Sequence, residues 1–279
     1  MTGPLREAYR VMRTIRAFGQ CVREASARGE LPGAEPVPTD DEAAATGVCL
    51  HLDERDAIVG TQCGYGHRIA GGVDVRAMMA ELYGRPGTRR SVGAVPHVAG
   101  GPPLICGTAL AAKLQGTGGV GVAFFGHDAN GDGATLEALH LATSWCLPVL
   151  FVAENTGRPR SSPGWTVASD SIADRAAAFG MPGEIVDGFD FFAVHEAAGE
   201  AVARARAGGG PTLIEARRFT IPPGCARGDC LSRFRGAVLD GGGLDESVLD
   251  GIDVEVAALV AASVAEAKAE PATADLVRY

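Results

Sequence analysis

The sequence lacks the features of a membrane or secreted protein. Its termini show no signal peptide, and no apolar run is long enough to span a bilayer. The seven cysteines are odd in number and scattered, without the paired spacing of a zinc site or a disulfide framework. We therefore expect reduced thiols in a cytoplasmic protein that has no membrane partner.

The chain has fewer basic residues than acidic ones. The chain carries a formal net charge of −9 at pH 7, which argues against nucleic acid as a partner. Only 21% of the residues are charged and 46% are hydrophobic, which predicts a well-buried core rather than disorder. No repeat or linker divides the 279 residues, so we expect one domain over residues 1–279, with helical segments at both ends.

Short apolar runs alternate with helical patterns along most of the chain. Strands are predicted at Val120–Phe125, Val149–Ala153, Glu184–Val186 and Thr212–Ala216. Helices are predicted at Leu5–Leu31, after Thr39 or Asp40, at Val73–Tyr83, Leu104–Leu114, around Trp145, and at Ser171–Phe179, Phe191–Ala207 and Val254–Lys268. This alternation predicts an α/β fold with a doubly wound, mainly parallel sheet flanked by helices.

Three longer segments are predicted to be loops. Gly60–Gly72 is rich in glycine and contains His67, so it is either a bent ligand-facing loop or an ordinary surface turn. Gly84–Pro103 and Phe219–Arg235 are the other two loops. Long loops in a compact domain are often functional.

The stretch from Val120 to Pro163 organises the rest of the chain. It reads as a strand ending in Gly126, a polar glycine-rich loop, a helix, and a second strand followed by Asn155. Parallel strands end at the same edge of a sheet, where open α/β sheets bind ligands. An acidic loop and an asparagine at this edge can hold a hard cation between their oxygen atoms.

Several motifs resemble those of a known family, and together they cover almost the whole chain. They are AELYGR (Ala80–Arg85), GTALAAKLQG (Gly107–Gly116), FFG (Phe124–Gly126), EALHLATSWCLPVLFVAEN (Glu137–Asn155), SIADRAAAFGMPGEIVDGFD (Ser171–Asp190), GGPTLIEARRF (Gly209–Phe219) and IDVEV (Ile252–Val256). Through these motifs, the chain resembles the alpha subunit of the first component of thiamine-diphosphate-dependent 2-oxo acid dehydrogenases. Pyruvate, branched-chain and acetoin dehydrogenases are of this type.

The resemblance implies the thiamine-diphosphate-binding fold and a beta subunit, usually in a heterotetramer of two alpha and two beta subunits. It implies thiamine diphosphate between the subunits, with Mg²⁺ bridging its diphosphate. It also implies decarboxylation of a 2-oxo acid and transfer of the acyl or aldehyde unit, with a lipoyl-bearing acyltransferase as a possible acceptor.

The chain departs from the metal motif of this family. In a gapless alignment, His127 stands at the position of the metal-binding Asp and Thr156 at that of the second Asn. Asp128 and Asn155 are adjacent substitutes, and an alternative alignment makes Asp132 of a displaced GDG motif the ligand. The constant spacing between the FFG motif and the tryptophan of the next helix favours the gapless reading.

The resemblance therefore implies two overlapping sets of site residues, and it identifies no catalytic residue. The cofactor-binding set is Gly126, Asp128, Asn155, Thr156 and Arg158, and the metal-binding set is Asp128, Asp132 and Asn155.

Other family positions have changed as well. Gln62 and Cys63 replace the Tyr-Arg pair that holds the diphosphate, and the loop at Phe219–Arg235 has no histidine. Replacement charges and imidazoles are available, although each is also explained as a surface residue: Arg68, Arg158, Arg218, His67 and His97.

Three functions are compatible with this pattern. The first is an enzyme subunit that works with a beta partner. The second is a structural or regulatory partner of a beta subunit that no longer binds cofactor. The third is a repurposed enzyme in which Cys63, Cys225 or Cys230 is reactive.

Overall fold

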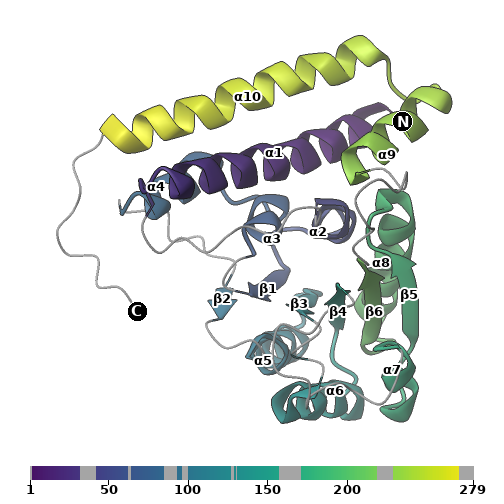
Figure 1. Ribbon diagram of the computed structural model, residues 1–279. Coiled ribbons are helices and arrows are strands. Elements are labelled where there is room, and N and C mark those ends of the chain that lie inside the picture. Colours follow the sequence, from purple (N-terminus) through teal and green to yellow (C-terminus); the bar gives the residue numbers. More distant parts are fainter. Residues whose placement is uncertain are drawn as a thin grey trace.

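The computed structural model describes residues 2–31, 42–61, 64–84, 93–95, 100–126, 129, 131–156, 171–218 and 229–269. Its described strands form one parallel sheet in the order β2-β1-β3-β4-β6-β5, which confirms the predicted α/β, doubly wound fold (Figure 1). The strands are β1 (Ala57–Thr61), β2 (Gly93–Val95), β3 (Gly121–Gly126), β4 (Val149–Asn155), β5 (Gly183–Asp187) and β6 (Thr212–Arg217).

Helices cover both faces of this sheet. They are α1 (Thr2–Ala27), α2 (Glu42–Cys49), α3 (Tyr65–Ala70), α4 (Val75–Leu82), α5 (Gly101–Gln115), α6 (Gly133–Ser144), α7 (Asp174–Ala178), α8 (Phe191–Arg206), α9 (Cys230–Asp240) and α10 (Glu246–Ala269). One face packs against α5, α6 and α7, and the other against α2 and α8. Figure 1 shows α5 and α6 on one side of the sheet, and α1 and α10 beyond α2 and α3 on the other. None of the described helices has both the length and the apolarity that crossing a membrane requires.

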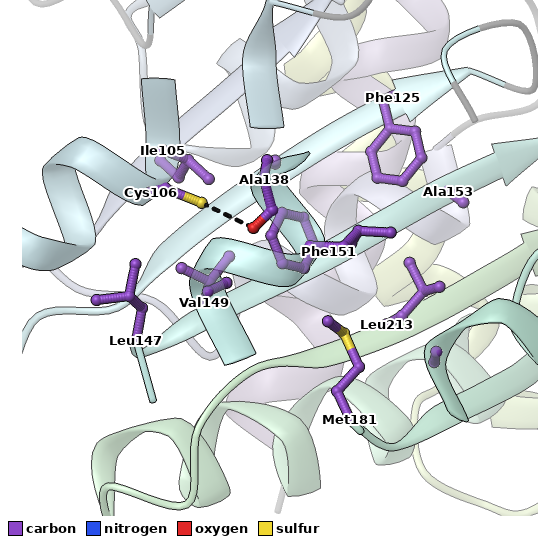
Figure 2. Close-up of a cluster of buried hydrophobic side chains, with 14 of the residues drawn as sticks. Ile105, Cys106, Phe125, Ala138, Leu147, Val149, Phe151, Ala153, Met181 and Leu213 are labelled. Carbon is purple, nitrogen blue, oxygen red and sulfur yellow. Dashed lines mark hydrogen bonds between the residues drawn. The ribbon is translucent and has the colours of Figure 1, made fainter. Parts of the chain in front are cut away.

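The central strands are buried on both faces because their apolar runs are nearly continuous. Side chains alternate along a strand, so Phe151 and Leu213 point to the face of α5, α6 and α7, while Val152 and Ile214 point to the opposite face. Figure 2 shows the first of these cores, in which the Cys106 thiol donates to the carbonyl oxygen of Ala138 at 3.5 Å.

Most predicted helices and strands are confirmed, but the three predicted loops are wrong in part. Gly60–Gly72 contains the end of β1 and the helix α3, and Gly84–Pro103 contains β2 and the start of α5. Both strands are short, with five and three residues, so they carry little alternation for a sequence pattern to detect.

Two boundaries near the carboxyl end also differ from the prediction. The loop that the sequence predicts over Phe219–Arg235 ends early, because α9 begins at Cys230. The Asp229 carboxylate caps this helix by accepting from the Ser232 N–H at 3.2 Å. The last helix begins at Glu246 rather than at Val254. Polar residues on the exposed sides of these helices obscured the helical period.

The strand order indicates where a ligand of this fold would bind. The order reverses between β1 and β3, and open α/β sheets bind ligands outside the carboxyl ends of the strands at such a point. In the register of β3 and β4, Gly126 pairs with Glu154, so the chain leaves β3 directly beside Asn155. The predicted polar strand ends therefore lie at one edge of the sheet.

We predict that Phe151→Ala lowers the free energy of unfolding by about 3–5 kcal/mol, because it opens a cavity in the fully buried core. Urea denaturation of the full chain measures the change. Leu114→Ala, at a side chain that is 78% exposed, is the control and should change the free energy by less than about 0.5 kcal/mol. Equal losses in the two variants would contradict the assignment of this core.

Candidate functional site

Two buried carboxylates lie at the carboxyl edge of the sheet, one on each face. Glu215 of β6 is fully buried and Glu154 of β4 is 9% exposed. Glu215 shares the face of Leu213, which packs against α5, α6 and α7, whereas Glu154 shares the opposite face with Val152. Burying a carboxylate is costly unless donors surround it, so the donors to these two groups define the site.

One oxygen of Glu215 binds the two strands together. The side-chain amide of Asn155, at the end of β4, donates to Glu215 Oε1 at 2.8 Å. The Arg217 guanidinium, two residues along β6, donates to the same oxygen at 3.0 Å. Because Asn155 pairs with Arg217 in the sheet register, both donors come from the last pair of residues in the two strands.

The other oxygen of Glu215 holds the segment that leads into α7. Glu215 Oε2 accepts hydrogen bonds from the Ser171 hydroxyl at 2.8 Å, the Ile172 N–H at 2.8 Å and the Ala173 N–H at 3.0 Å. The Ser171 hydroxyl also accepts from the Asp174 N–H at 3.3 Å. A single carboxylate thus joins β4, β6 and the start of α7.

The second carboxylate, Glu154, is held by two basic side chains. His67 Nε2 lies 3.3 Å from Glu154 Oε1, and Arg218 Nη1 lies 3.6 Å from the same oxygen. The His67 ring stacks on Phe124 of β3, with ring centroids 4.0 Å apart. Helix α3 and the ends of β3, β4 and β6 therefore meet at this group.

These contacts lower the pKa of both carboxyl groups. Burial alone raises the pKa of Glu215, but hydrogen bonds from Ala173, Asn155, Ser171 and Arg217 outweigh it, so the pKa lies below its ordinary value. Burial likewise raises the pKa of Glu154, and the His67 imidazole and the Arg218 guanidinium together lower it further than burial raises it. Both groups are ionised at neutral pH.

The surface alternative is wrong for two of the basic residues. His67 is 2% exposed on helix α3. Arg218 is buried beside Glu154. Arg68 pairs with Glu81 at 2.7 Å and so serves α3 and α4 rather than an anion.

The predicted cofactor and metal residues lie partly within the described chain. Gly126 ends β3, Asn155 ends β4, and Thr156 follows directly. Gln62, Cys63, His97, His127, Asp128, Arg158 and Cys225 lie outside the described residues.

Asp132 has a structural task in this fold. It is the N-cap of α6, and its Oδ1 accepts from the Ala134 N–H at 2.9 Å. The GDG motif therefore lies at the start of α6, where its aspartate satisfies a backbone N–H of the first helical turn.

The described residues alone do not fit a magnesium ion. Mg²⁺ takes a near-octahedral shell of oxygen ligands. Of the three predicted ligands, the described chain supplies the neutral amide of Asn155 and the capping carboxylate of Asp132. Across the described ranges, no three His, Cys, Asp or Glu side chains gather in the way that a metal site needs.

Cys230 is not a reactive thiol. It is buried, it donates to Glu42 Oε2 at 3.1 Å, and it lies 3.7 Å from Arg16 Nη2. Burial and the Glu42 carboxylate raise the pKa of the thiol far above its ordinary range, which removes the thiolate needed for nucleophilic attack. Arg16 also pairs with Glu42 and Asp229, so this cluster joins α1, α2 and α9.

A cavity of about 250 Å³ lies at the opposite edge of the sheet. Its lining includes Gly119, just before β3, and Pro148, just before β4. Ligands of open α/β sheets bind at the carboxyl ends of the strands, so this cavity at the amino ends is not the candidate site.

Sequence reasoning missed Glu215 and the pairing of Glu154. A signal for Glu215 was present, because one acidic residue interrupts the apolar strand TLIEA. A charge in a strand that is buried on both faces needs several donors, and such a group commonly belongs to a functional network.

We predict that Glu154→Gln costs about 3 kcal/mol of unfolding free energy at neutral pH, because it removes the charged partner of the buried Arg218 and His67 side chains. A lowered folded-state pKa stabilises the protein above the unfolded pKa, and this stability is lost as pH falls. The difference from wild type should therefore shrink below about pH 4.3.

Urea denaturation across this pH range measures the difference. Glu137→Gln, at an exposed glutamate of α6, is the matched control and should follow the wild-type curve. A Glu154→Gln deficit that stays constant with pH would contradict the assigned ionisation.

Comparison with known proteins agrees with the resemblance seen in the motifs. Residues 9–223 match the family described as dehydrogenase E1 component. The chain is 45% identical to the alpha subunit of an acetoin:2,6-dichlorophenolindophenol oxidoreductase from Cupriavidus necator, over 94% of this chain and 89% of that relative.

Two further relatives show the same pattern. The chain is 46% identical to the subunit of the same name from Bacillus subtilis, over 76% of this chain and 68% of the relative. It is 31% identical to a pyruvate dehydrogenase E1 component subunit alpha from Rhizobium meliloti, over 95% of this chain and 86% of the relative. The match of the family over residues 9–223, together with these identities, means that this chain belongs to the dehydrogenase E1 component family.

Proposed function

We propose that this chain is the alpha-type subunit of a heteromeric thiamine-diphosphate-dependent enzyme that acts on a 2-oxo acid together with a beta subunit. The relatives at 45% and 46% identity are named as alpha subunits, and a name of that kind presupposes a second type of subunit. Because these relatives are named for acetoin, an acyloin is included among the substrates to test.

The carboxyl edge of β4 and β6 is the observation that carries this proposal. Glu154 and Glu215 keep two ionised groups in the interior, each with its own donors, at the edge where this fold binds ligands. A purely structural sheet is stabilised at least as well by apolar residues at such positions. The retained charges therefore favour a working site.

In the proposed enzyme, the cofactor is bound by Gly126, Asn155 and Thr156. Asp128 and Arg158, which lie outside the described residues, complete this site. Its metal ligands are Asn155 and one of the two aspartates, Asp128 or Asp132. Within the described chain, Glu215 orients Asn155 and the Glu154 group fixes α3 beside β3.

The proposed enzyme is a cytoplasmic heterotetramer of two alpha and two beta subunits. The beta subunit completes the site across the carboxyl edge. A lipoyl-bearing acyltransferase accepts the acyl or aldehyde unit.

A second candidate is a partner that stabilises the beta subunit without binding cofactor. The capping role of Asp132 favours it, because this acidic side chain already serves α6. The presence of His127 at the family's metal-binding Asp position favours it as well.

We predict that the chain, co-purified with its beta subunit, binds thiamine diphosphate with Mg²⁺ in titration calorimetry. It should also reduce 2,6-dichlorophenolindophenol when given pyruvate, another 2-oxo acid or acetoin. The same titration on each subunit alone is the control, since the proposed site lies between them.

Two other outcomes would contradict the proposal. A stable complex that takes up no cofactor would overturn the enzymatic proposal in favour of the cofactor-free partner. Failure of the two chains to assemble would contradict both candidates.

A further inference from the structure

We propose that the stacked imidazoles of His51 and His195 form an acid-sensitive latch between α2 and α8. His51 lies in the turn that follows α2, and His195 lies near the start of α8. In this latch, the neutral rings hold the two helices together and an added proton weakens their contact. The inference goes beyond the proposed function and does not depend on it, because neither residue belongs to the proposed cofactor site.

The two rings are stacked face to face. Their centroids are 4.0 Å apart and their planes differ by 25°. The His195 ring also stacks on Phe191, with ring centroids 5.2 Å apart. The three rings therefore form a short column, which α8 supplies with two members and the turn after α2 supplies with one.

Glycines on both helices make room for this column. A Cβ atom at Gly199 of α8 would lie 2.8 Å from Cε1 of His51, and one at Gly47 of α2 would lie 2.8 Å from Cγ1 of Val194. Neither position accepts a side chain without displacing its neighbour. The two helices therefore approach each other closely where the imidazoles meet.

Hydrogen bonds determine which nitrogen of each neutral ring carries its proton. His51 Nε2 lies 2.8 Å from the carbonyl oxygen of His195, and His195 Nδ1 lies 3.2 Å from the carbonyl oxygen of Gly47. A carbonyl oxygen only accepts, so the nitrogen that faces it is the donor. The other two nitrogens, Nδ1 of His51 and Nε2 of His195, are the positions that take up a proton in acid.

Protonation places positive charge in a half-buried contact between two imidazoles. Burial disfavours the charged ring of His51, and repulsion from His195 adds to this, so the pKa of His51 lies below its ordinary value. When a base has a lowered pKa in the folded state, its stabilising contribution is fully present above the unfolded pKa of about 6.5. This contribution is lost as the pH falls toward the folded value. The contact between α2 and α8 therefore weakens in mild acid.

The charged groups of α2 and of the turn that follows it are paired elsewhere. Glu42, at the other end of α2, pairs with Arg16 of α1. The Cys49 thiol stays neutral, because burial raises its pKa. In the turn, Asp53 pairs with Arg55 at 2.6 Å. Helix α2 is thus held by an ion pair at its amino end and by the imidazole stack at its carboxyl end.

The charged groups of α8 do not offset the added proton either. Burial raises the pKa of Glu184 in β5, and Glu200 and Glu196 of α8 raise it further, which places these two carboxylates near β5. Arg206, at the end of α8, pairs with Asp56 at 2.6 Å. Among the described residues, the hydrogen-bond partners of the two rings are backbone carbonyls rather than carboxylates. An imidazolium in the stack therefore has no opposite charge to stabilise it within the described chain.

Amide hydrogen exchange of the full chain at about pH 7.5 and about pH 5.5 tests the latch, since histidine changes its charge in this range. The readout is the end of α2, where the Leu50, His51 and Leu52 N–H groups donate to carbonyl oxygens of that helix. After correction for intrinsic exchange rates, we expect their protection to fall about tenfold at the lower pH. The N–H groups of β4 should keep their protection.

His51→Gln separates the latch from other effects of acid. Its side-chain amide keeps an N–H donor for the His195 carbonyl but does not titrate, so the protection of the same N–H groups should no longer depend on pH. His140→Gln, at an exposed histidine of α6, is the matched control and should show the wild-type decrease. If His51→Gln does not fold, His195→Gln replaces it, because it keeps a donor for the Gly47 carbonyl and lacks a titrating ring.

Three results would overturn the latch. They are equal protection of the wild-type chain at the two pH values, a full decrease in His51→Gln, and an equal loss of protection in β4, which would indicate general unfolding by acid. Cofactor binding enters none of these measurements, so the latch and the proposed function succeed or fail separately.

Discussion

A buried carboxylate with five converging donors fixes the carboxyl edge of this protein. Glu215 sits in the interior of β6 and is fully buried. An isolated charge in that position would destabilise the fold by several kcal/mol, so the structure around it must supply donors. The register of β4 against β6, the start of α7 and the direction of Asn155 all satisfy that requirement.

The opposite face of the sheet repeats the arrangement with different partners. Glu154 is bound by His67 and Arg218 rather than by backbone N–H groups. The stacking of His67 on Phe124 holds α3 against β3, beside the point where the strand order reverses. The edge therefore has two rigid charged groups, one on each face, around the position where this fold binds its ligands.

Local patterns in the sequence were enough to predict the fold class and the strand ends that meet at the carboxyl edge of the sheet. The apolar runs of β3 and β4 and the helix between them predict a parallel unit, and that unit brings Gly126 and Asn155 to neighbouring strand ends. Burial of His67 and Arg218 was not predictable in the same way. Both depend on a contact with Glu154, which is 87 and 64 residues distant along the chain. Glu215 was missed because its donors come from segments whose pairing only the folded chain reveals.

Hydrogen exchange of the Ile172 and Ala173 N–H groups tests the central role of Glu215 most directly. Both groups donate to Glu215 Oε2, so they should exchange slowly in the wild-type chain. In Glu215→Gln they should exchange much faster, while the N–H groups of β3 keep their protection. Unchanged protection of Ile172 and Ala173 in that variant would contradict the account, because these groups would then be held by something other than Glu215.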